Sequence, residues 1–363
     1  MKHFKKFLLW SKARFLPTIP IPHSPFSLFL SPFSLLLVPF SLNAQVFQIS
    51  VVSPDDETTL FTDLNLAIQD AQPGSIVYIP GGIFQIHDST KINKKLTIIG
   101  IGHRTDNDNA DGYTQVIGNL CFEIGSDNSS VIGLYLSGSV NIGKTDEDIT
   151  YFLLRYCNVN SVQIGSKYCQ HVLINQNYIR GTCNGGDSPV YFMNNILHSI
   201  SHINNGVIAN NLIANAGNAG LIYCTGTVTL YASLNYINFT RIENNFFLVN
   251  TSPCNYYILY NTSNSFFYNN AACESLGENC IVVSNFNDVF IGPFNSISIT
   301  SNFHLKDGPW KTGAIDGGEI GIYGGGGFGD SQLPPIPRIT HKRIAEQTDE
   351  EGKLKIQIQV KAQ

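Results

Sequence analysis

The sequence has little charge, and this scarcity is its first structural signal. Lys, Arg, Asp and Glu together make up only 13% of the 363 residues. Surface helices of globular proteins need a charged or polar face, so a chain with so little charge is not built mainly from amphipathic helices. Gly (32), Phe (23) and Tyr (16) are common instead. This composition is typical of many short strands joined by tight turns.

The first 44 residues contain no acidic residue at all. They carry five basic residues, an apolar run from Phe26 to Leu42, and then the small residue Ala44. A basic start, an apolar stretch and a small residue at a cleavage position are features of an export signal. We therefore expect residues 1–44 to be a signal peptide cleaved after Ala44, and the mature protein, starting at Gln45, to be secreted or held at the cell surface or envelope.

A membrane anchor is the alternative interpretation of this segment, because a spanning helix needs about 20 apolar residues. Three prolines, Pro25, Pro32 and Pro39, recur at seven-residue intervals within it and would interrupt such a helix. Without the five basic residues of the signal, 17 basic residues remain against 27 acidic ones, a net charge of −10. This balance does not favour nucleic acid or an anionic membrane as a partner, and we expect no membrane span after signal removal.

The eight cysteines include no Cys-x-x-Cys pair, so the sequence lacks the commonest zinc-binding spacing. All eight lie after the expected cleavage site, where disulfides are permitted. Cys273 and Cys280 are close enough in sequence to close a small loop. The alternative is that the cysteines are free thiols stacked in the core.

The mature chain begins with a strand-like segment, 46–52, and then one short amphipathic helix. Phe61, Leu64, Ile68 and Ala71 recur at helical spacing and predict this helix, which ends before Pro73-Gly74. Short strands are expected next at 76–79, 83–86 and 96–99.

A quasi-repeat follows from about Val131. An alternating apolar segment is followed by Asn and then by mostly apolar residues, at Asn177, Asn195, Asn211, Asn245, Asn270 and Asn302. The intervals are 18, 16, 34, 25 and 32 residues, near one or two coils of a solenoid. Asn tolerates a left-handed backbone at a sharp bend, and its amide can bond to the Asn of the next coil. We expect Asn195, Asn211 and Asn245 to stack in this way.

The N-terminal motifs carry a family resemblance. They are Leu64–Ala71, the run Pro73–Phe84, which reads Pro-Gly-Ser-Ile-Val-Tyr-Ile-Pro-Gly-Gly-Ile-Phe, and Lys95–Gly102. The chain resembles the secreted right-handed parallel β-helix proteins of the pectin-lyase-like superfamily, especially those of the Bacteroidetes type. The resemblance covers roughly residues 53–335 and departs from the family at Ser75, where Asp is common. It implies an all-β, right-handed parallel β-helix solenoid over 45–335, closed by a short N-terminal capping helix.

The C-terminal part begins with a glycine-rich segment over 313–327. Such a loop cradles phosphate only when a helix follows it, and no helical pattern follows here. We interpret the segment as a flexible exit from the solenoid. Ile336–Ile344 and the alternating residues Leu354–Val360 flank the turn 349–352, which predicts a small β-hairpin within 336–363.

Acidic residues are scarce in the repeat region, with only five between Tyr151 and Thr300. Glycosidic cleavage needs two placed carboxylates or a metal-assisted base. Our first hypothesis is therefore an exported, non-catalytic β-helix scaffold or surface protein that contacts extracellular or cell-surface glycans. The alternative is a polysaccharide lyase or glycoside hydrolase. Its candidate catalytic residues are Asp187 and Glu243 beside Arg180 and Arg241.

One segment has the oxygen spacing of a calcium loop. Asn107, Asn109 and Asp111 would supply ligands, although Gly118 stands where a bidentate Glu should close the loop. The alternative is a solvated insertion, and we expect no cofactor other than this possible calcium. His198 and His202 are four residues apart, but on a segment that reads as strand or turn rather than helix. Five tyrosines are candidates for glycan contact or for the core: Tyr156, Tyr191, Tyr223, Tyr256 and Tyr257.

Overall fold

The computed structural model describes residues 48–88, 90–104, 112–215, 231–249, 256–260, 262–272, 275–292, 301–328, 334–345 and 347–361. The expected signal peptide with Ala44 lies outside these residues, as do the calcium candidates Asn107, Asn109 and Asp111, and Cys273 of the expected disulfide. Within the described residues, no helix has the length and apolar character needed to cross a membrane.

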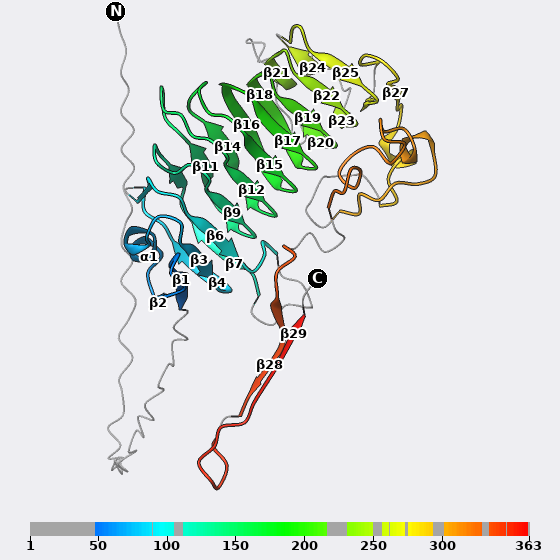
Figure 1. The fold of residues 1–363 in the computed structure, drawn as a ribbon. Helices are drawn as coiled ribbons and strands as arrows, with labels where there is room; N and C mark the ends of the chain where they lie inside the picture. Colours follow the sequence, from blue (N-terminus) through cyan, green and yellow to red (C-terminus); the bar gives the residue numbers. More distant parts are fainter. Residues whose placement is uncertain are drawn as a thin grey trace, which may run out of the picture. The chain divides into compact units, whose positions relative to one another are not determined.

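The first of two long sheets has 11 strands and runs along the solenoid (Figure 1). Its order is β2 (Thr58–Phe61), β1 (Ile49–Val52), β3 (Ile76–Ile79), β6 (Thr97–Gly100), β9 (Ser130–Ile132), β12 (Leu153–Arg155), β15 (Val172–Asn175), β17 (Val190–Met193), β19 (Val207–Ala209), β22 (Arg241–Glu243) and β25 (Phe266–Tyr268). The β1 strand pairs antiparallel with both β2 and β3. From β3 to β25 every neighbouring pair is parallel.

The second sheet has 16 strands along two connected paths. One path is β4 (Gly82–Gln85), β7 (Thr114–Ile117), β10 (Tyr135–Leu136), β13 (Asn158–Val159), β16 (Tyr178–Ser188), β18 (Ile196–Asn204), β20 (Leu212–Asn215), β23 (Phe246–Val249), β26 (Ala271–Ala272) and β27 (Ile281–Val282). The other path begins with β5 (Lys91–Ile92), β8 (Leu120–Phe122), β11 (Ser139–Ile142) and β14 (Ser161–Ile164), and β14 pairs with β16. It leaves the first path again at β18, which pairs with β21 (Tyr231–Asn238), and β21 pairs with β24 (Tyr256–Tyr260). The fold is therefore the predicted all-β parallel β-helix.

Alternation along each strand builds the core. In the first sheet, Ile98, Val131, Leu154, Ile174, Phe192, Ile208 and Ile242 occupy one column through the parallel register. All are at most 1% exposed. Burying a side chain of this size stabilises the fold by about 1.5–3 kcal/mol. Since each coil repeats this column, the coils stabilise one another mainly through nearest neighbours.

The predicted helix is α1 (Leu64–Asp70), which packs Leu64, Ala67 and Ile68 into the core. Phe61, which we assigned to the helix, lies in β2 instead. The difference arises at Asp63, whose extended backbone and side chain form the helix N-cap. A residue whose side chain accepts the first helical amides sets the start of a helix more strongly than apolar spacing does.

The recurring asparagines form a continuous buried column at the bend between the sheets. The amides of Asn177, Asn195, Asn211 and Asn245 each donate to the side-chain oxygen of the Asn in the next coil, ending at Asn270, over 3.0–3.1 Å. The backbone amide of each donor residue binds the same oxygen at 2.9–3.0 Å. All five are 0% exposed. Asn302 is not in this column, because it is exposed and its side chain accepts from the backbone of His304.

The residue before each column Asn has a left-handed backbone, and its side chain points away from the core. Gln176, Asn194, Asn210, Asn244 and Asn269 have φ between 51° and 57°. Gln176 donates to the Gly327 carbonyl at 2.6 Å, Asn194 to that of Gly324 at 2.7 Å, and Asn269 to that of Gly313 at 2.7 Å. The glycine-rich segment is thus held along the bend, and our interpretation of it as a flexible exit is wrong.

Apolar residues fasten the same segment to the solenoid. Ile196, Leu212 and Phe246 project outward from the second sheet and form a cluster with Phe290, Phe303, Ile320, Ile322 and Phe328. The 3-10 helices η1 (Phe286–Asp288) and η2 (Pro309–Lys311) lie within this covering region. We call residues 276–292 and 301–328 the C-terminal cover.

The predicted hairpin is also present. β28 (Arg338–Ile344) pairs antiparallel with β29 (Ile356–Lys361). Its turn is fixed by the Asp349 carboxylate, which accepts the backbone amides of Glu351 and Lys353 at 3.1 and 2.7 Å.

Candidate functional site

The four candidate catalytic residues do not form one cluster in the hydrogen bonds and ion pairs of the described residues. Arg241 and Glu243 are on β22 of the first sheet, where Arg241 Nε lies 3.1 Å from Glu243 Oε2. Arg180 is on β16 of the second sheet, and Asp187 is exposed near the end of that strand with φ of 60°. The structure therefore brings Arg241 and Glu243 together but gives neither Arg180 nor Asp187 a bond to them.

Arg180 is occupied by the preceding coils. Its guanidinium donates to the Tyr135 hydroxyl at 2.5 Å and to the Leu136 carbonyl at 2.6 Å, and it lies 4.7 Å from the centre of the Tyr135 ring. These contacts engage donors on both terminal nitrogens of the guanidinium. Arg180 thus ties two coils together on the outer face of the second sheet.

Metal-ligating residues are equally dispersed. Among the residues that the structure describes, no group of three or more His, Cys, Asp or Glu is placed to hold a metal ion. His198 and His202 both lie on β18, so they are strand residues, as the sequence indicated. Burial lowers the pKa of His198.

Three cysteines belong to the core. Cys157, Cys169 and Cys183 are free thiols at 0% exposure. Burial raises the pKa of Cys157 to about 12 and also raises the pKa of Cys183, because a thiolate there would lose its hydration. These thiols are packing residues rather than nucleophiles.

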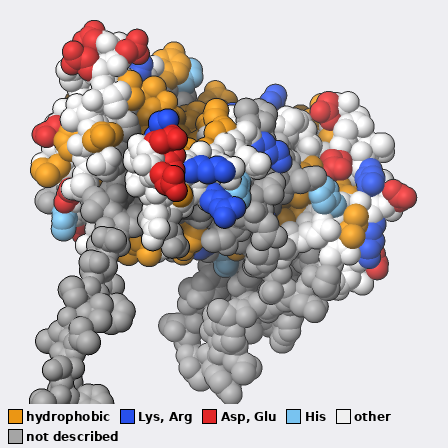
Figure 2. Space-filling view, turned by 90° about the horizontal axis from the view of Figure 1, so that it is seen from below, with side chains coloured by type: hydrophobic (Ala, Val, Ile, Leu, Met, Phe, Trp, Pro, Cys, Tyr) orange, Lys and Arg blue, Asp and Glu red, His pale blue; other side chains and the backbone are white. Residues whose placement is uncertain are grey.

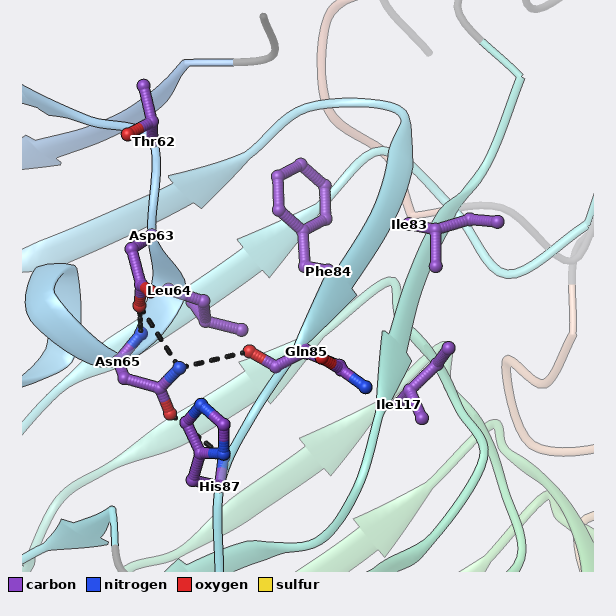
Figure 3. A pocket seen from close by; sticks show the side chains of 9 residues that line it. All are labelled: Thr62, Asp63, Leu64, Asn65, Ile83, Phe84, Gln85, His87 and Ile117. Atoms are coloured by element: carbon purple, nitrogen blue, oxygen red, sulfur yellow. Dashed lines mark hydrogen bonds between the residues drawn. The ribbon is translucent and has the colours of Figure 1, made fainter.

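A pocket of about 420 Å³ opens between α1 and the first coil, lined by Thr62, Asp63, Leu64, Asn65, Ile83, Phe84, Gln85, His87 and Ile117 (Figure 3). Two of its polar side chains, Asp63 and Asn65, bond to each other and to nearby backbone groups. The Asn65 amide donates to Asp63 Oδ1 at 3.0 Å and to the Gln85 carbonyl at 3.2 Å, and its oxygen accepts the His87 backbone amide at 2.8 Å. Asp63 also accepts the Asn65 backbone amide at 2.6 Å. The pocket therefore serves to fasten the capping helix.

The Asp63 carboxylate can be tested as this fastener. Asp63→Ala should lower the free energy of unfolding by about 1 kcal/mol, the usual effect of losing an N-cap. Slight burial opposes ionisation, but hydrogen bonds from the Asn65 side chain and from the backbone amides of Leu66 and Asn65 outweigh it and lower the pKa of Asp63. This contribution is present above the unfolded pKa and is lost as the pH falls through the folded one.

Urea unfolding of the wild type, Asp63→Ala and Asp63→Asn at pH 7 and near pH 3 measures both effects. Asp63→Asn retains the oxygen acceptor, so it should be nearly as stable as the wild type at pH 7 and should lack its acid sensitivity. Equal stability of Asp63→Ala and the wild type at pH 7 would contradict the capping role.

The second sheet carries a different kind of surface on β11, β14, the ends of β16 and β18, and β21. Inward residues here, such as Val140, Val162, Cys183, Ile200 and Leu234, are all 0% exposed. The alternating outward residues form two adjacent columns, one of hydroxyl side chains at Ser139, Ser161, Thr182 and Ser199, and one mostly of amides at Asn141, Gln163, Asn184, Ser201 and Asn235. We call these nine side chains the polar strip.

The polar strip contains no charged side chain. Some of its members bond to neighbours: Ser139 Oγ lies 2.6 Å from Ser161 Oγ, and Asn184 accepts the Gly186 amide at 2.9 Å. The side chains of Gln163, Thr182 and Ser199 form no hydrogen bond with the described residues. The strip therefore offers neutral donors and acceptors to a ligand.

Glycines border the polar strip on both long sides. Gly138 and Gly181 precede the hydroxyl column, and Gly143 and Gly165 follow the amide column. A methyl group at Gly138 would approach the Gly118 carbonyl to 2.2 Å, so the coils can stack at this spacing only with glycine there. The strip consequently has no side-chain walls at these positions.

Exposed aromatic side chains occupy turns and strand ends of other coils. Tyr151 is 58% exposed and stacks on His171 with ring centres 4.6 Å apart. Further exposed aromatics are Tyr168, Tyr236, Phe239 and Phe266. Of the five tyrosines named from the sequence, Tyr156 is 7% exposed and contacts Arg155, and Tyr191 is partly exposed. Tyr223 lies outside the described residues, and the side chains of Tyr256 and Tyr257 are likewise not described.

Sequence reasoning missed the polar strip because Ser, Thr, Asn and Gln are also turn residues. The signal that was present is their alternation with buried aliphatic residues, for example in 139–142 and 161–164. Figure 2 shows charged side chains in small separate groups on the face that it draws, with uncharged side chains between them.

Comparisons with known proteins add no relative to this geometry: no family model, no curated protein and no solved structure matches the chain.

Proposed function

We propose that this chain is an exported, non-catalytic β-helix that binds neutral glycans through the polar strip. The observation that carries the proposal is the strip itself, in which uncharged hydrogen-bonding side chains occupy nine outward positions of a stacked sheet, with Ser161 alone among them buried, at 9% exposure. Amides and hydroxyls both donate and accept, as sugar hydroxyls do. A ligand of matching chemistry is a carbohydrate surface rich in hydroxyl groups.

Charge favours neutral over acidic glycans. The strip supplies no cation to bind a uronate, and the chain after the expected cleavage site has a net charge of −10. An acidic polysaccharide would therefore be repelled at long range without a compensating contact. Exposed aromatics such as Tyr151 and Tyr168 add faces on which sugar rings can stack.

Export and family membership belong to the same proposal. The acid-free basic start and Ala44 support a cleaved signal and a location outside the cytoplasm. The Pro-Gly motif at 73–74 and the capping helix α1 before the first coil support a pectin-lyase-like β-helix of the Bacteroidetes type. N-terminal sequencing of secreted protein should begin at Gln45.

Glycan-array binding of the mature protein tests the proposal. Wild type should bind neutral polysaccharides in preference to polygalacturonate, and the double variant Asn141→Ala/Gln163→Ala should bind at least tenfold more weakly. Gln357→Ala/Gln359→Ala is the matched control, because it removes two exposed amides from β29. No binding to any neutral glycan, or equal loss in both double variants, would refute the function.

The rival enzyme hypothesis predicts turnover, and we expect none. Arg241 and Glu243 neutralise each other, and no second acid is bonded to them among the described residues. Polygalacturonate and neutral polysaccharides should remain uncleaved with and without added calcium, measured by absorbance at 235 nm and by reducing-end release. Cleavage abolished by Glu243→Gln or Asp187→Asn would establish the lyase or hydrolase instead.

A further inference from the structure

We infer that the polar strip takes one class of glycan, a linear, neutral, β-1,4-linked hexose chain that lies along the solenoid with one sugar residue on each coil. This inference rests on the proposed function and specifies its ligand. It follows from the spacing of the coils, the width of the strip and its open borders.

The spacing of the coils sets the repeat of the site. Ser139 pairs with Ser161, Asn141 with Gln163, and Gln163 with Asn184, all in parallel register. Neighbouring strands are about 4.8 Å apart, so equivalent side chains recur at that distance along the strip. This is close to the length of one pyranose residue in an extended β-1,4-linked chain. Successive sugars of such a chain are related by about half a turn, so they present alternate ring edges to equivalent positions on successive coils.

The width of the strip fits one sugar. On each coil the hydroxyl and amide positions are two residues apart, as with Ser139 and Asn141, or Ser161 and Gln163. Two residues along a strand span about 7 Å, comparable with a pyranose ring and its substituents. Each sugar can therefore contact one hydroxyl and one amide on β11, β14 or β16, and the two hydroxyls of Ser199 and Ser201 on β18.

The vacant hydrogen-bonding groups lie on consecutive coils. Gln163 on β14, Thr182 on β16 and Ser199 on β18 all lack a side-chain hydrogen bond to the described residues. A bound ligand displaces water from these polar side chains, which then need other hydrogen-bond partners, and sugar hydroxyls can supply them. Three adjacent coils thus offer unsatisfied groups, Gln163 in the amide column and Thr182 and Ser199 in the neighbouring hydroxyl column.

The glycines beside the strip determine how the affinity for a glycan depends on the number of its sugars. Gly138 and Gly165 have no side chain that could enclose a single sugar. A side chain at either position would collide with the backbone of the preceding coil. Binding energy must then come from many weak and equivalent contacts. Affinity should grow with chain length, whereas a walled pocket would be saturated by one or two sugars.

Calorimetric titration with β-1,4-linked glucose and mannose oligomers of two to five units tests this expectation on the mature protein, because the strip occupies five strands, β11, β14, β16, β18 and β21. For at least one of the two series, the association constant should rise at least threefold with each added sugar. Gln163→Ala, on the second of these five strands, should weaken five-unit binding at least tenfold. The same substitution should change two-unit binding less than twofold, since a short chain can bind the remaining coils.

Gln357→Ala on β29 is the matched control and should change neither affinity. Circular dichroism and thermal melting establish that Gln163→Ala remains folded, as its outward side chain predicts. Affinity that stops rising at three sugars, or an equal effect of Gln163→Ala on both lengths, would overturn the linear site while leaving glycan binding by the strip intact. Failure of both oligomer series to bind, while the array detects another neutral glycan, would overturn the ligand class alone. Failure of every neutral glycan would refute the proposed function as well.

Discussion

Asn211→Ala should lower the free energy of unfolding by about 3 kcal/mol or more. The substitution removes the side-chain oxygen that accepts from the backbone and amide nitrogens of Asn195 at 2.9 and 3.0 Å. It also removes the donor to the Phe192 and Ala209 carbonyls at 2.8 and 3.0 Å. All of these groups are buried, and each one left unpaired costs about 1–3 kcal/mol. Local relaxation or an entering water reduces the sum.

Equilibrium unfolding in urea measures this effect, and Asn302→Ala is the matched control. Asn302 is an exposed Asn from the same sequence pattern, and its side chain accepts the nearby His304 backbone amide at 3.0 Å. Its substitution should cost less than about 0.5 kcal/mol, as is usual for an exposed position. A cost below about 0.3 kcal/mol for Asn211→Ala would contradict the role of the column.

Phe290→Ala should lower the free energy of unfolding of the cover by about 3–5 kcal/mol, the usual cost of emptying a buried phenylalanine site. Phe290 is 1% exposed, with its ring 5.2 Å from that of Phe246 and 6.4 Å from that of Phe303, centre to centre. Because Phe246 projects from the outer face of β23, loss of the Phe290 ring weakens the attachment of the C-terminal cover to the solenoid. The cover should then open before the coils unfold.

Limited proteolysis followed by mass spectrometry measures this opening, with cleavage expected within the C-terminal cover in Phe290→Ala and not in the wild type. Phe266→Ala is the control, because Phe266 is 59% exposed at the edge strand β25 and its loss creates no cavity. If Phe290→Ala and the wild type resist protease equally at the same temperature, the cover is not held through this residue.

The sequence predicted the architecture because its signals are local. Alternation of apolar residues, the single helical segment at Leu64–Asp70 and the recurrence of Asn at coil-like intervals each depend on neighbours a few residues apart. The terminal hairpin followed from the same kind of pattern in Ile356–Lys361. The start of α1 was missed by three residues, since the N-cap bonds of Asp63 outweigh the helical spacing of Phe61.

The candidate site was less predictable from the sequence. Arg180, Arg241, Asp187 and Glu243 were selected by charge, but whether charged groups meet depends on which sheet and coil each one occupies. The Arg180 guanidinium is instead taken up by Tyr135 and Leu136, more than forty residues away in the sequence. The polar strip arises because strands such as β11, β14 and β16 align their outward residues in register.

What the sequence by itself determined is the repeating coil, because each coil buries its own alternating residues and repeats the same bend. Only the tertiary structure decided what lies on the outside of those coils. The glycine-rich segment carries no local sign of order, yet Gln176, Asn194 and Asn269 bind it through carbonyls 44 to 151 residues away. The physical reason is that a left-handed residue at the bend turns its side chain outward. Its hydrogen-bond partner there depends on the path that the C-terminal segment takes back along the solenoid.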